Sequence, residues 1–352
     1  MVWLKRPQSR FETGSRRTLP DMSTREHILL TGAGFTKNFG APLAAELWSI
    51  ILGSPYLAEY PDLQNILRNN FDFESVFHQV ITGSYGNDEK KAMNDAVYEA
   101  YHYIDRLMKQ LSSTGICLNG LREMIGRFAG SAGQPGFVFT LNQDLFLERY
   151  YRNQSGPPIC IPGIERGQRW FSEEFRGPMD SGDQVQLPAS SPPIDHLLKQ
   201  AGFYYVKLHG SMNWYDPRGE FRLVIGQGKE SIINAEPILK SYLEIFREAL
   251  CSGKRRLLCI GYSFRDRHIN EVLVESIKHG LQLFVLSPGA PDTLQKQLKE
   301  QGCAELWSAL AEYFPFDLRT LFPENQTGAY TPQCAHVLRR FFNDRSGDAL
   351  RS

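Results

Sequence analysis

Short apolar runs that end in polar or glycine-bearing turns constrain the fold of this chain most strongly. Short runs of mostly apolar residues are typical of parallel strands buried on both faces. Segments with apolar residues at helical spacing lie between them, notably 41–52, 238–250 and 269–278. This alternation predicts an α/β fold with a Rossmann-like parallel sheet and helices on both faces. The apolar runs are residues 27–31, 136–140, 204–208, 256–260 and 282–286.

Three other regions are expected to add to this sheet. Residues from about 55 to 130 carry mixed-charge segments with apolar side chains at helical steps, which predicts an inserted helical module. Residues from about 155 to 203 are rich in proline, glycine and serine, so an irregular excursion is expected there. Residues 291–352 are expected to form a C-terminal helical extension. The central domain is therefore expected to span residues 25–290.

The N-terminal segment, residues 1–24, contains basic side chains among serine, proline and glycine without a periodic apolar pattern. We expect it to be disordered. A basic targeting peptide is one interpretation of this segment, but Met22 starts a stretch that leads directly into the first convincing strand, so translation starting at Met22 is an alternative to a start at Met1. Intact-mass measurement of natively expressed protein decides between the two, because a species that retains residues 1–21 excludes the later start.

Charge and cysteine content limit the partners of the chain. Lysine plus arginine and aspartate plus glutamate both total 39, so no overall field attracts nucleic acid or an anionic membrane. The longest apolar runs are far shorter than the roughly 20 residues of a membrane span. No secretory segment is evident, which favours a cytoplasmic location. No two of the six cysteines form the close pairs of a structural zinc site, so no metal is expected.

Glycines follow the first strand at 31–36, in the sequence Thr-Gly-Ala-Gly-Phe-Thr. A glycine-rich loop between a strand and a helix lets backbone N–H groups approach a pyrophosphate. The third glycine of the usual dinucleotide fingerprint would fall at Lys37, so the loop differs from that of Rossmann dehydrogenases. A plain strand-to-helix turn remains the alternative.

Three more polar blocks follow predicted strands. They are Thr140-Leu141-Asn142-Gln143-Asp144, Leu208-His209-Gly210-Ser211 and Gly261-Tyr262-Ser263-Phe264. In an open α/β sheet ligands bind at the carboxyl ends of the strands. We therefore expect the loop tips that carry Gly34, Asn142 and His209 to converge around one nucleotide.

The four blocks, in this order, resemble the motifs of sirtuins. The first block continues to Gly40 and Pro42, as the first sirtuin motif does. The match is closer to the sirtuin-like NAD-hydrolase domains of bacterial antiphage defence systems, which KLHGSMNW at 207–214 and GYSFRDRHIN at 261–270 resemble. The resemblance covers roughly residues 27–290 and implies a sirtuin-like NAD-binding catalytic domain.

The chain departs from protein-deacylating sirtuins in two respects. Leu43, Ala44 and Ala45 stand where those enzymes continue with aspartate, phenylalanine and arginine. The cysteine pairs of their small zinc domain are also absent. Because that domain helps to build the acyl-peptide site, its loss weighs against a peptide substrate.

Asn142 and His209 are the candidate catalytic residues. Cleavage of the nicotinamide–ribose bond passes through an oxocarbenium-like centre, so the site must orient the ribose and activate water. Asparagine can orient water or a ribose hydroxyl without adding charge, and histidine can accept a proton near neutrality. The alternatives are a core histidine satisfied by backbone for His209, and a helix cap or Asx turn for Asn142 and Asp144.

The resemblance assigns binding roles to other residues. It implies that Asp144 holds the nicotinamide carboxamide and that Ser263 contacts phosphate or ribose, with Gly261 in the same block. It also implies that the first loop lines the phosphates through Gly32, Ala33, Gly34 and Thr36. Asp266 and His268 lie close together as metal ligands do, but no third ligand is evident, so we expect them to cap and pack the following helix.

The first hypothesis for function is an NAD⁺ glycohydrolase that releases ADP-ribose and nicotinamide. The resemblance implies an antiphage effector that acts by NAD⁺ depletion, assembles as a homo-oligomer and works beside a sensor protein or a ring-forming ATPase. A non-catalytic NAD⁺ or ADP-ribose sensor is the second hypothesis. An ADP-ribosyltransferase that modifies a macromolecule is the third. Product analysis after incubation with NAD⁺ separates the three.

Overall fold

The computed structural model of the chain describes ten ranges. These are residues 25–109, 115–131, 133–151, 157–164, 184–199, 201–216, 219, 223–226, 228–326 and 330–343. The segment 1–24, which the sequence predicts to be disordered and which contains Met22, lies outside the described residues. Much of the expected excursion, residues 165–183, also lies outside them.

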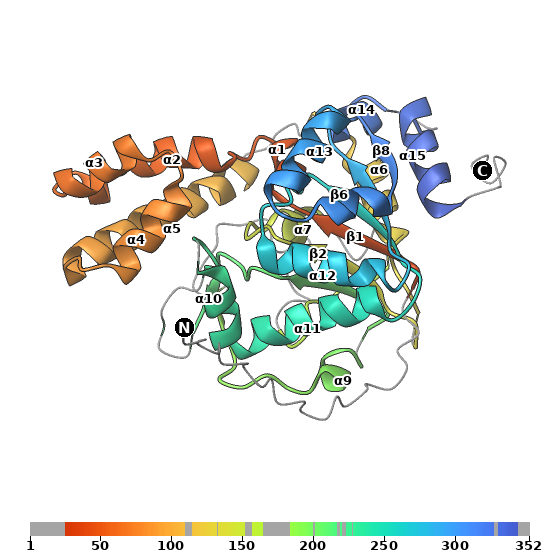
Figure 1. The fold of residues 1–352 in the computed structure, drawn as a ribbon, viewed down its shortest axis with the longest axis horizontal. Helices are drawn as coiled ribbons and strands as arrows, with labels where there is room; N and C mark the ends of the chain where they lie inside the picture. Colours follow the sequence, from red (N-terminus) through yellow and green to blue (C-terminus); the bar gives the residue numbers. More distant parts are fainter. Residues whose placement is uncertain are drawn as a thin grey trace, which may run out of the picture.

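Six described strands form one parallel sheet at the centre of the molecule (Figure 1). The predicted α/β fold with a parallel sheet is therefore confirmed. Numbered along the chain, the strands lie in the order 3-2-1-4-5-6, which is that of doubly wound dinucleotide-binding folds. In space they are β4 (Phe203–Lys207), β2 (Gly136–Thr140), β1 (His27–Thr31), β6 (Arg256–Ile260), β7 (Gln282–Leu286) and β8 (Leu310–Phe314).

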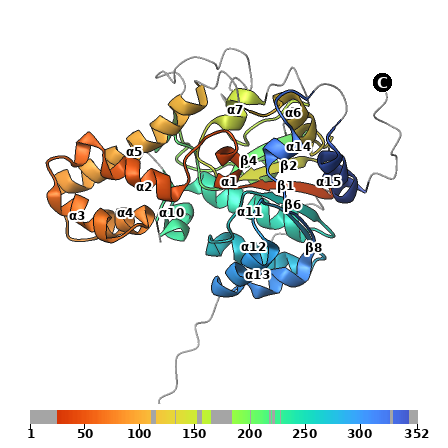
Figure 2. The same ribbon diagram turned by 90° about the horizontal axis from the view of Figure 1, so that it is seen from above.

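Helices cover both faces of the sheet, and all residues of β2, β4 and β6 are buried (Figure 2). On one face lie α11 (Pro237–Cys251) and α12 (Arg267–Ile277), and Phe139 of β2 packs edge-on against Phe246 of α11 at 4.8 Å. On the other face lie α6 (Leu118–Gly126), α7 (Phe146–Tyr150) and α14 (Leu318–Leu321). Burial on both faces explains why these strands read as continuous apolar runs.

A helical lobe stands beyond the carboxyl ends of the strands (Figure 1). It corresponds to most of the predicted insertion, except that α6 returns to the sheet. Its elements are α2 (Ala44–Leu52), η1 (Pro55–Leu57), α3 (Pro61–Asn69), α4 (Phe73–Thr82) and α5 (Asn87–Lys109).

The helix after the first loop differs from the prediction. The sequence predicts one helix over 41–52 that completes a strand–loop–helix unit. A short helix, α1 (Ala33–Lys37), follows the loop instead, and α2 packs against α3, α4 and α5. Gly40, at φ +93°, turns the chain between α1 and α2. The apolar spacing identified α2 as a helix but could not show against which element it packs.

The C-terminal segment contains a strand that the sequence analysis missed. Residues 291–343, predicted to be helical, form α13 (Pro291–Glu300), η4 (Ala304–Ala309), β8, α14 and α15 (Pro332–Phe342). β8 extends the sheet beside β7. It is an edge strand, and only Phe314 of its five residues is buried. Leu306 and Leu310 suggested helical spacing there, but Leu310 begins the strand.

Short elements occupy the described part of the excursion and the region after it. β3 (Val185–Gln186) pairs with β5 (Trp214–Tyr215), and α9 (Ile194–Leu197) precedes β4. β4 begins at Phe203, one residue earlier than predicted. After β5 the chain reaches α10 (Lys229–Ala235), which packs against α11.

The loops that follow β1 and β6 touch each other through their backbones. Gly32 N donates to Ile260 O at 3.0 Å, and Gly34 N donates to Gly261 O at 2.9 Å. A Cβ atom on Gly34 would lie 2.7 Å from Gly261 Cα, and one on Gly261 would lie 2.2 Å from Phe35 N. Gly261 also has φ +66°. β1 and β6 are the strands between which the winding reverses, where α/β sheets bind their ligands.

Substitution of Gly261 by alanine should destabilise the protein much more than substitution of Gly40. Both glycines have positive φ, but nothing lies within 4 Å of a Cβ atom on Gly40. Gly40→Ala should therefore cost only the backbone strain, about 1–2 kcal/mol. Gly261→Ala adds overlap with backbone and should cost roughly 3–5 kcal/mol. Urea unfolding measures both, and equal losses would contradict the proposed backbone contact.

Candidate functional site

Three loops at the carboxyl edge of the sheet are joined by backbone hydrogen bonds. Leu141 N donates to Thr31 O at 2.9 Å, and Leu208 N donates to Thr140 O at 2.9 Å. Met212 N donates to Gln143 O at 2.9 Å. The loops that follow β1, β2 and β4 therefore lie side by side, as the sequence predicts.

Thr36 connects the first loop with the second. Asn142 Nδ2 donates to Thr36 Oγ1 at 3.3 Å, and the nearby Thr36 side chain acts to lower the pKa of the Asp144 carboxyl, which burial raises. Asn142 N in turn donates to Thr140 Oγ1 at 3.0 Å. Three residues predicted for the site are thus in direct contact, and all three are buried.

The Asx turn considered for Asp144 is present. Asp144 Oδ1 accepts a hydrogen bond from Phe146 N at 3.0 Å. Burial raises the pKa of the Asp144 carboxyl, and the nearby ammonium of Lys207 opposes that shift. Asp144 therefore shapes its own loop and also contacts Thr36.

A buried ion pair supports this loop from below. Lys207, at the end of β4, donates to Asp144 O at 2.5 Å and to Glu148 Oε1 at 2.6 Å. The side chains of Lys207 and Glu148 are fully buried. A buried ammonium needs such partners, because burying an unpaired charge costs several kcal/mol. Lys207, the first residue of KLHGSMNW, thus fixes the backbone of the Asn142 loop.

The glycines of the first loop do not act as the sequence analysis assumed. The N–H groups of Gly32 and Gly34 donate to β6 and to Gly261, and Phe35 N donates to Gly32 O at 2.8 Å. These donors are therefore occupied within the protein and do not point to a ligand. The absence of side chains at Gly32 and Gly34 allows the close approach of Gly261 instead. Ala33, between them, is exposed.

The block after β6 adopts an unusual backbone. Phe264 is buried although its φ of 54° is left-handed, a conformation that costs a non-glycine residue about 1–2 kcal/mol. Asn270 of α12 stabilises it: its Nδ2 donates to Phe264 O at 2.7 Å, and its Oδ1 accepts from Tyr262 Oη at 2.9 Å. Ser263 is exposed, and its carbonyl accepts from Gln297.

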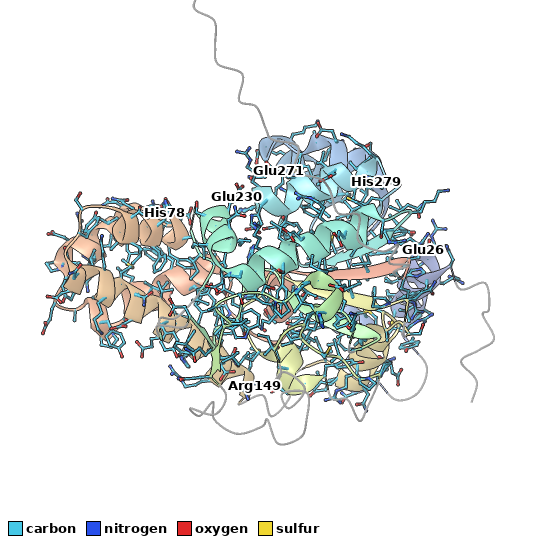
Figure 3. All side chains as sticks on the ribbon, turned by 90° about the horizontal axis from the view of Figure 1, so that it is seen from below. Glu26, His78, Arg149, Glu230, Glu271 and His279 are labelled. Carbon is cyan, nitrogen blue, oxygen red and sulfur yellow. The ribbon has the colours of Figure 1, made fainter. Side chains whose placement is uncertain are left out.

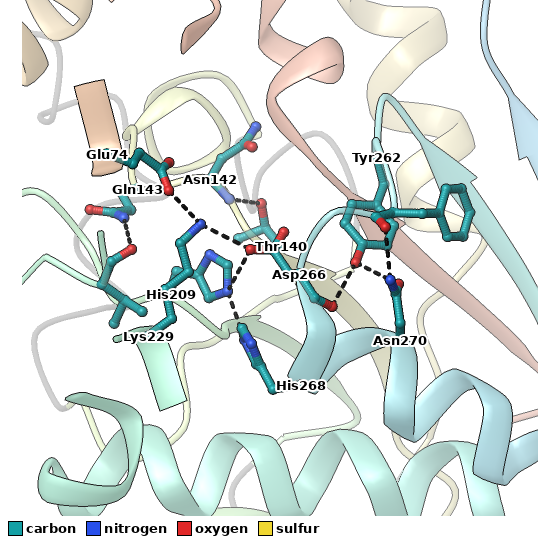
Figure 4. A network of polar contacts seen from close by, with 12 residues as sticks. Glu74, Thr140, Asn142, Gln143, His209, Lys229, Tyr262, Asp266, His268 and Asn270 are labelled. Atoms are coloured by element: carbon teal, nitrogen blue, oxygen red, sulfur yellow. Dashed lines mark hydrogen bonds and ion pairs between the residues drawn. The ribbon is translucent and has the colours of Figure 1, made fainter. Parts of the chain in front are cut away.

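His209 lies in a polar network that reaches the helical lobe (Figure 4). His209 Nε2 lies 3.0 Å from His268 Nε2 and 4.0 Å from Asp266 Oδ1. Asp266 Oδ1 accepts from Lys229 Nζ at 2.9 Å, and the same ammonium lies 2.9 Å from Glu74 Oε2 of α4. The network thus joins residues from the lobe, α10, α12 and the loop after β4.

Burial and charge set the protonation of this network. Burial lowers the pKa of His209 to about 3, although the carboxylate of Asp266 opposes the shift. Burial likewise lowers the pKa of His268 to about 4. For Asp266, burial is outweighed by His209 and Lys229, which lower its pKa. For Lys229, burial is outweighed by Asp266 and Glu74, which raise its pKa. At neutral pH both histidines are neutral and the other groups are charged.

The expected capping role of Asp266 is wrong. Asp266 precedes α12 at the N-cap position, but its side chain accepts no cap hydrogen bond. The carboxylate is occupied by Lys229 and faces His209. Glu74 and Lys229 were not identified from the sequence, because Glu74 is distant from His209 along the chain and Lys229 lies in a region without a motif. Asp266 and His268 gave the only local signal, an acid and a histidine two residues apart.

The described part of the chain shows no metal cluster, disulfide or membrane-spanning helix. No group of three or more His, Cys, Asp or Glu residues could hold a metal ion there. The six cysteines are free. No helix among the described residues has the length and apolar character needed to cross a membrane.

The chain matches a known family over part of its length. Residues 136–306 match the family model of the SIR2-like domain. The match begins at β2 and includes Asn142, Asp144, His209 and Gly261, but not the first loop or the lobe. Over these residues the chain is similar to the SIR2-like domain.

Similarity to whole proteins is weak. The chain is similar to a solved structure described as "Structural Basis for the Mechanism and Regulation of Sir2 Enzymes", with 12% sequence identity. The similarity covers 82% of this chain and 95% of that chain, with a TM-score of 0.32. No curated protein matches the chain.

The neutral histidine pair predicts a loss of stability in mild acid. The pKa of each ring in the folded protein lies below the unfolded value of 6.5. Between about pH 4 and 6.5 the unfolded chain therefore binds protons that the folded protein does not, and the free energy of unfolding falls as the pH falls. At pH 5 the loss should be about 2 kcal/mol for each ring.

Urea unfolding at pH 7 and pH 5 measures this effect. In His268→Gln the free energy of unfolding should fall less between pH 7 and pH 5 than in the wild type, by the roughly 2 kcal/mol that one ring contributes. His279, which is exposed and lies on the outer surface of the sheet domain (Figure 3), provides the matched control as His279→Gln. Equal losses in the wild type and His268→Gln would contradict a neutral, buried His268.

Proposed function

We propose that this chain is an NAD⁺ glycohydrolase that converts NAD⁺ and water to ADP-ribose, nicotinamide and a proton. The observation that carries the proposal is the contact between Asn142, Thr36 and Asp144, in a chain similar to the SIR2-like domain, at the position where a 3-2-1-4-5-6 sheet reverses its winding. Sheets of this kind bind dinucleotides at that position. NAD⁺ enters here as the substrate, and no zinc is required by the proposal.

The residues at the site suit the binding of a dinucleotide. The backbone approach of Gly32 and Gly34 to Gly261 leaves no side chains between β1 and β6. Thr36 and the exposed Ala33 can then face phosphate, and Ser263 can reach phosphate or ribose from the loop after β6. Gln143 Oε1 is buried without a hydrogen-bond partner among the described residues, beside Asp144. This acceptor and the Asp144 carboxyl suit a ligand that carries an amide, as nicotinamide does.

The reaction requires a base and an oriented water. The bond between the nicotinamide nitrogen and the ribose breaks, the electron pair leaves with nicotinamide, and the oxygen of water bonds to the ribose carbon. Asn142 orients the water or a ribose hydroxyl, and His209 accepts the proton that is released. A net negative charge beside His209, from Glu74, Asp266 and Lys229, stabilises the imidazolium that forms.

We further propose a role for this activity in antiphage defence by NAD⁺ depletion. The resemblance of KLHGSMNW and GYSFRDRHIN to domains of such systems supports it. Unrestrained hydrolysis would deplete the NAD⁺ of the host, so we expect restraint by assembly into a homo-oligomer or by a partner. A sensor protein or a ring-forming ATPase encoded nearby is the expected kind of partner.

Substitution of either catalytic residue should abolish most of the activity. Purified protein, with and without proteins encoded beside it, is incubated with NAD⁺, and the products are separated by chromatography. Asn142→Ala and His209→Ala should each lower the release of nicotinamide by about 100-fold or more, as loss of a general base does. His279→Ala should retain full activity, because His279 is exposed and lies outside the network.

Other outcomes would support other functions. Tight binding of NAD⁺ without any release of nicotinamide would support a sensor. Transfer of label from NAD⁺ to protein or nucleic acid would support an ADP-ribosyltransferase. Full activity in both the Asn142 and His209 variants would remove the proposed catalytic assignments.

A further inference from the structure

A second imidazole lies directly against the proposed base. The Nε2 atoms of His209 and His268 are 3.0 Å apart, and the ring centroids are 5.1 Å apart. Both residues are buried, with 3% and 6% of their surface exposed. His268 belongs to the first turn of α12. When two neutral imidazoles share a hydrogen bond, one ring donates and the other accepts.

The surroundings of His209 determine which ring donates. The His209 ring hydrogen bonds to the backbone carbonyl of Leu141, which favours its protonated form. Because Nε2 faces His268, we infer that Nδ1 is the nitrogen that donates to this carbonyl. A neutral ring has only one N–H, so Nε2 of His209 carries the lone pair and accepts from His268. This tautomer leaves Nε2 as the basic nitrogen of His209.

The charged groups around the pair favour the uptake of one proton. Asp266 and Glu74 share the single ammonium of Lys229, so these three groups carry a net charge of −1. Asp266 Oδ1 lies 4.0 Å from His209 Nε2, and Glu271 also faces His268. A proton on His209 would neutralise the charge that Asp266, Glu74 and Lys229 leave, which stabilises the imidazolium formed in base catalysis.

We propose that His268 is a positioning residue for His209. Its Nε2–H group fixes the orientation of the His209 ring in the tautomer in which Nε2 is basic. When the hydroxyl of the ribose or the water arrives, it replaces His268 as the donor to His209 Nε2 and transfers its proton there. His268 stays neutral throughout. The proposal rests on the proposed function, because it assigns a role to His268 in that reaction.

Two substitutions separate positioning from packing. His268→Gln retains an N–H donor on a side chain of similar reach, whereas His268→Phe retains a buried ring and no donor. His268→Phe should lower kcat by about 10–100-fold, as loss of a residue that orients a catalytic group does, with KM changed by less than about threefold. His268→Gln should recover most of this loss. His279→Phe, on the surface, should equal the wild type.

Nitrogen NMR of the histidines in the ligand-free protein tests the same bond without the reaction. With ¹⁵N-labelled histidine, Nε2 of His209 should show the shift of an unprotonated nitrogen, and Nε2 of His268 that of an N–H nitrogen. In His268→Phe the Nε2 signal of His209 should shift, because Nε2 loses its hydrogen-bond donor, while the Leu141 carbonyl retains the Nδ1–H tautomer. His209→Ala and His268→Phe assign the signals.

The outcomes separate this proposal from the proposed function. If the wild type releases nicotinamide and His268→Phe is as active as the wild type, or more active, His268 does not position the base and the proposal is overturned. Activity above that of the wild type would show instead that His268 hinders the reaction at His209. If the wild type releases no nicotinamide, the proposed function fails, and NMR still decides the pair: a protonated Nε2 on His209 would overturn the inferred hydrogen bond.

Discussion

The contact between the backbones that follow β1 and β6 is the constraint on which the site depends. Gly32 and Gly34 lie against Gly261 with no space for a Cβ atom on any of them. The pairing of parallel strands does not by itself fix the distance between these two loops, because side chains of any size could separate them. With glycine on both sides the loops are in contact. Thr36, at the end of the first loop, can then reach Asn142 and Asp144 from the second.

Buried charges stabilise the loops that the sheet leaves exposed at its edge. Lys207 connects the Asp144 backbone to Glu148, and Lys229 connects Asp266 to Glu74. Each ammonium is taken out of water, and its partners offset that cost only when the geometry is maintained. The arrangement therefore favours one conformation of the loops more than it favours stability. The proposed function, in which Asn142 and His209 act around one ribose, would require such loops.

The buried strands could be predicted from the sequence, because their apolar residues are consecutive. The edge strand and the charged partners of the histidines could not, because they depend on contacts between distant parts of the chain. β1, β2, β6 and β7 were predicted at their observed bounds, because burial on both faces requires an unbroken apolar run. β8 was missed because an edge strand keeps polar residues such as Glu312 and shows no such run. Asn142, Asp144 and His209 were predicted as site residues because each lies in a loop that follows a strand, and they stay a prediction. Glu74 and Lys229 lie on helices of mixed composition, and only the fold brings them to Asp266.

Polar contacts join the helical lobe to the sheet domain and link its position to the network around His209. Arg149 of α7 forms a buried ion pair with Asp105 of α5, and Lys229 binds Glu74 of α4. Hydrogen bonds and ion pairs depend on direction and distance more strongly than apolar contacts do. If α4 moved away, Lys229 would neutralise Asp266 alone, and the net negative charge beside the histidine pair would be lost. The orientation of the lobe thus sets how well the protein can stabilise a proton on His209.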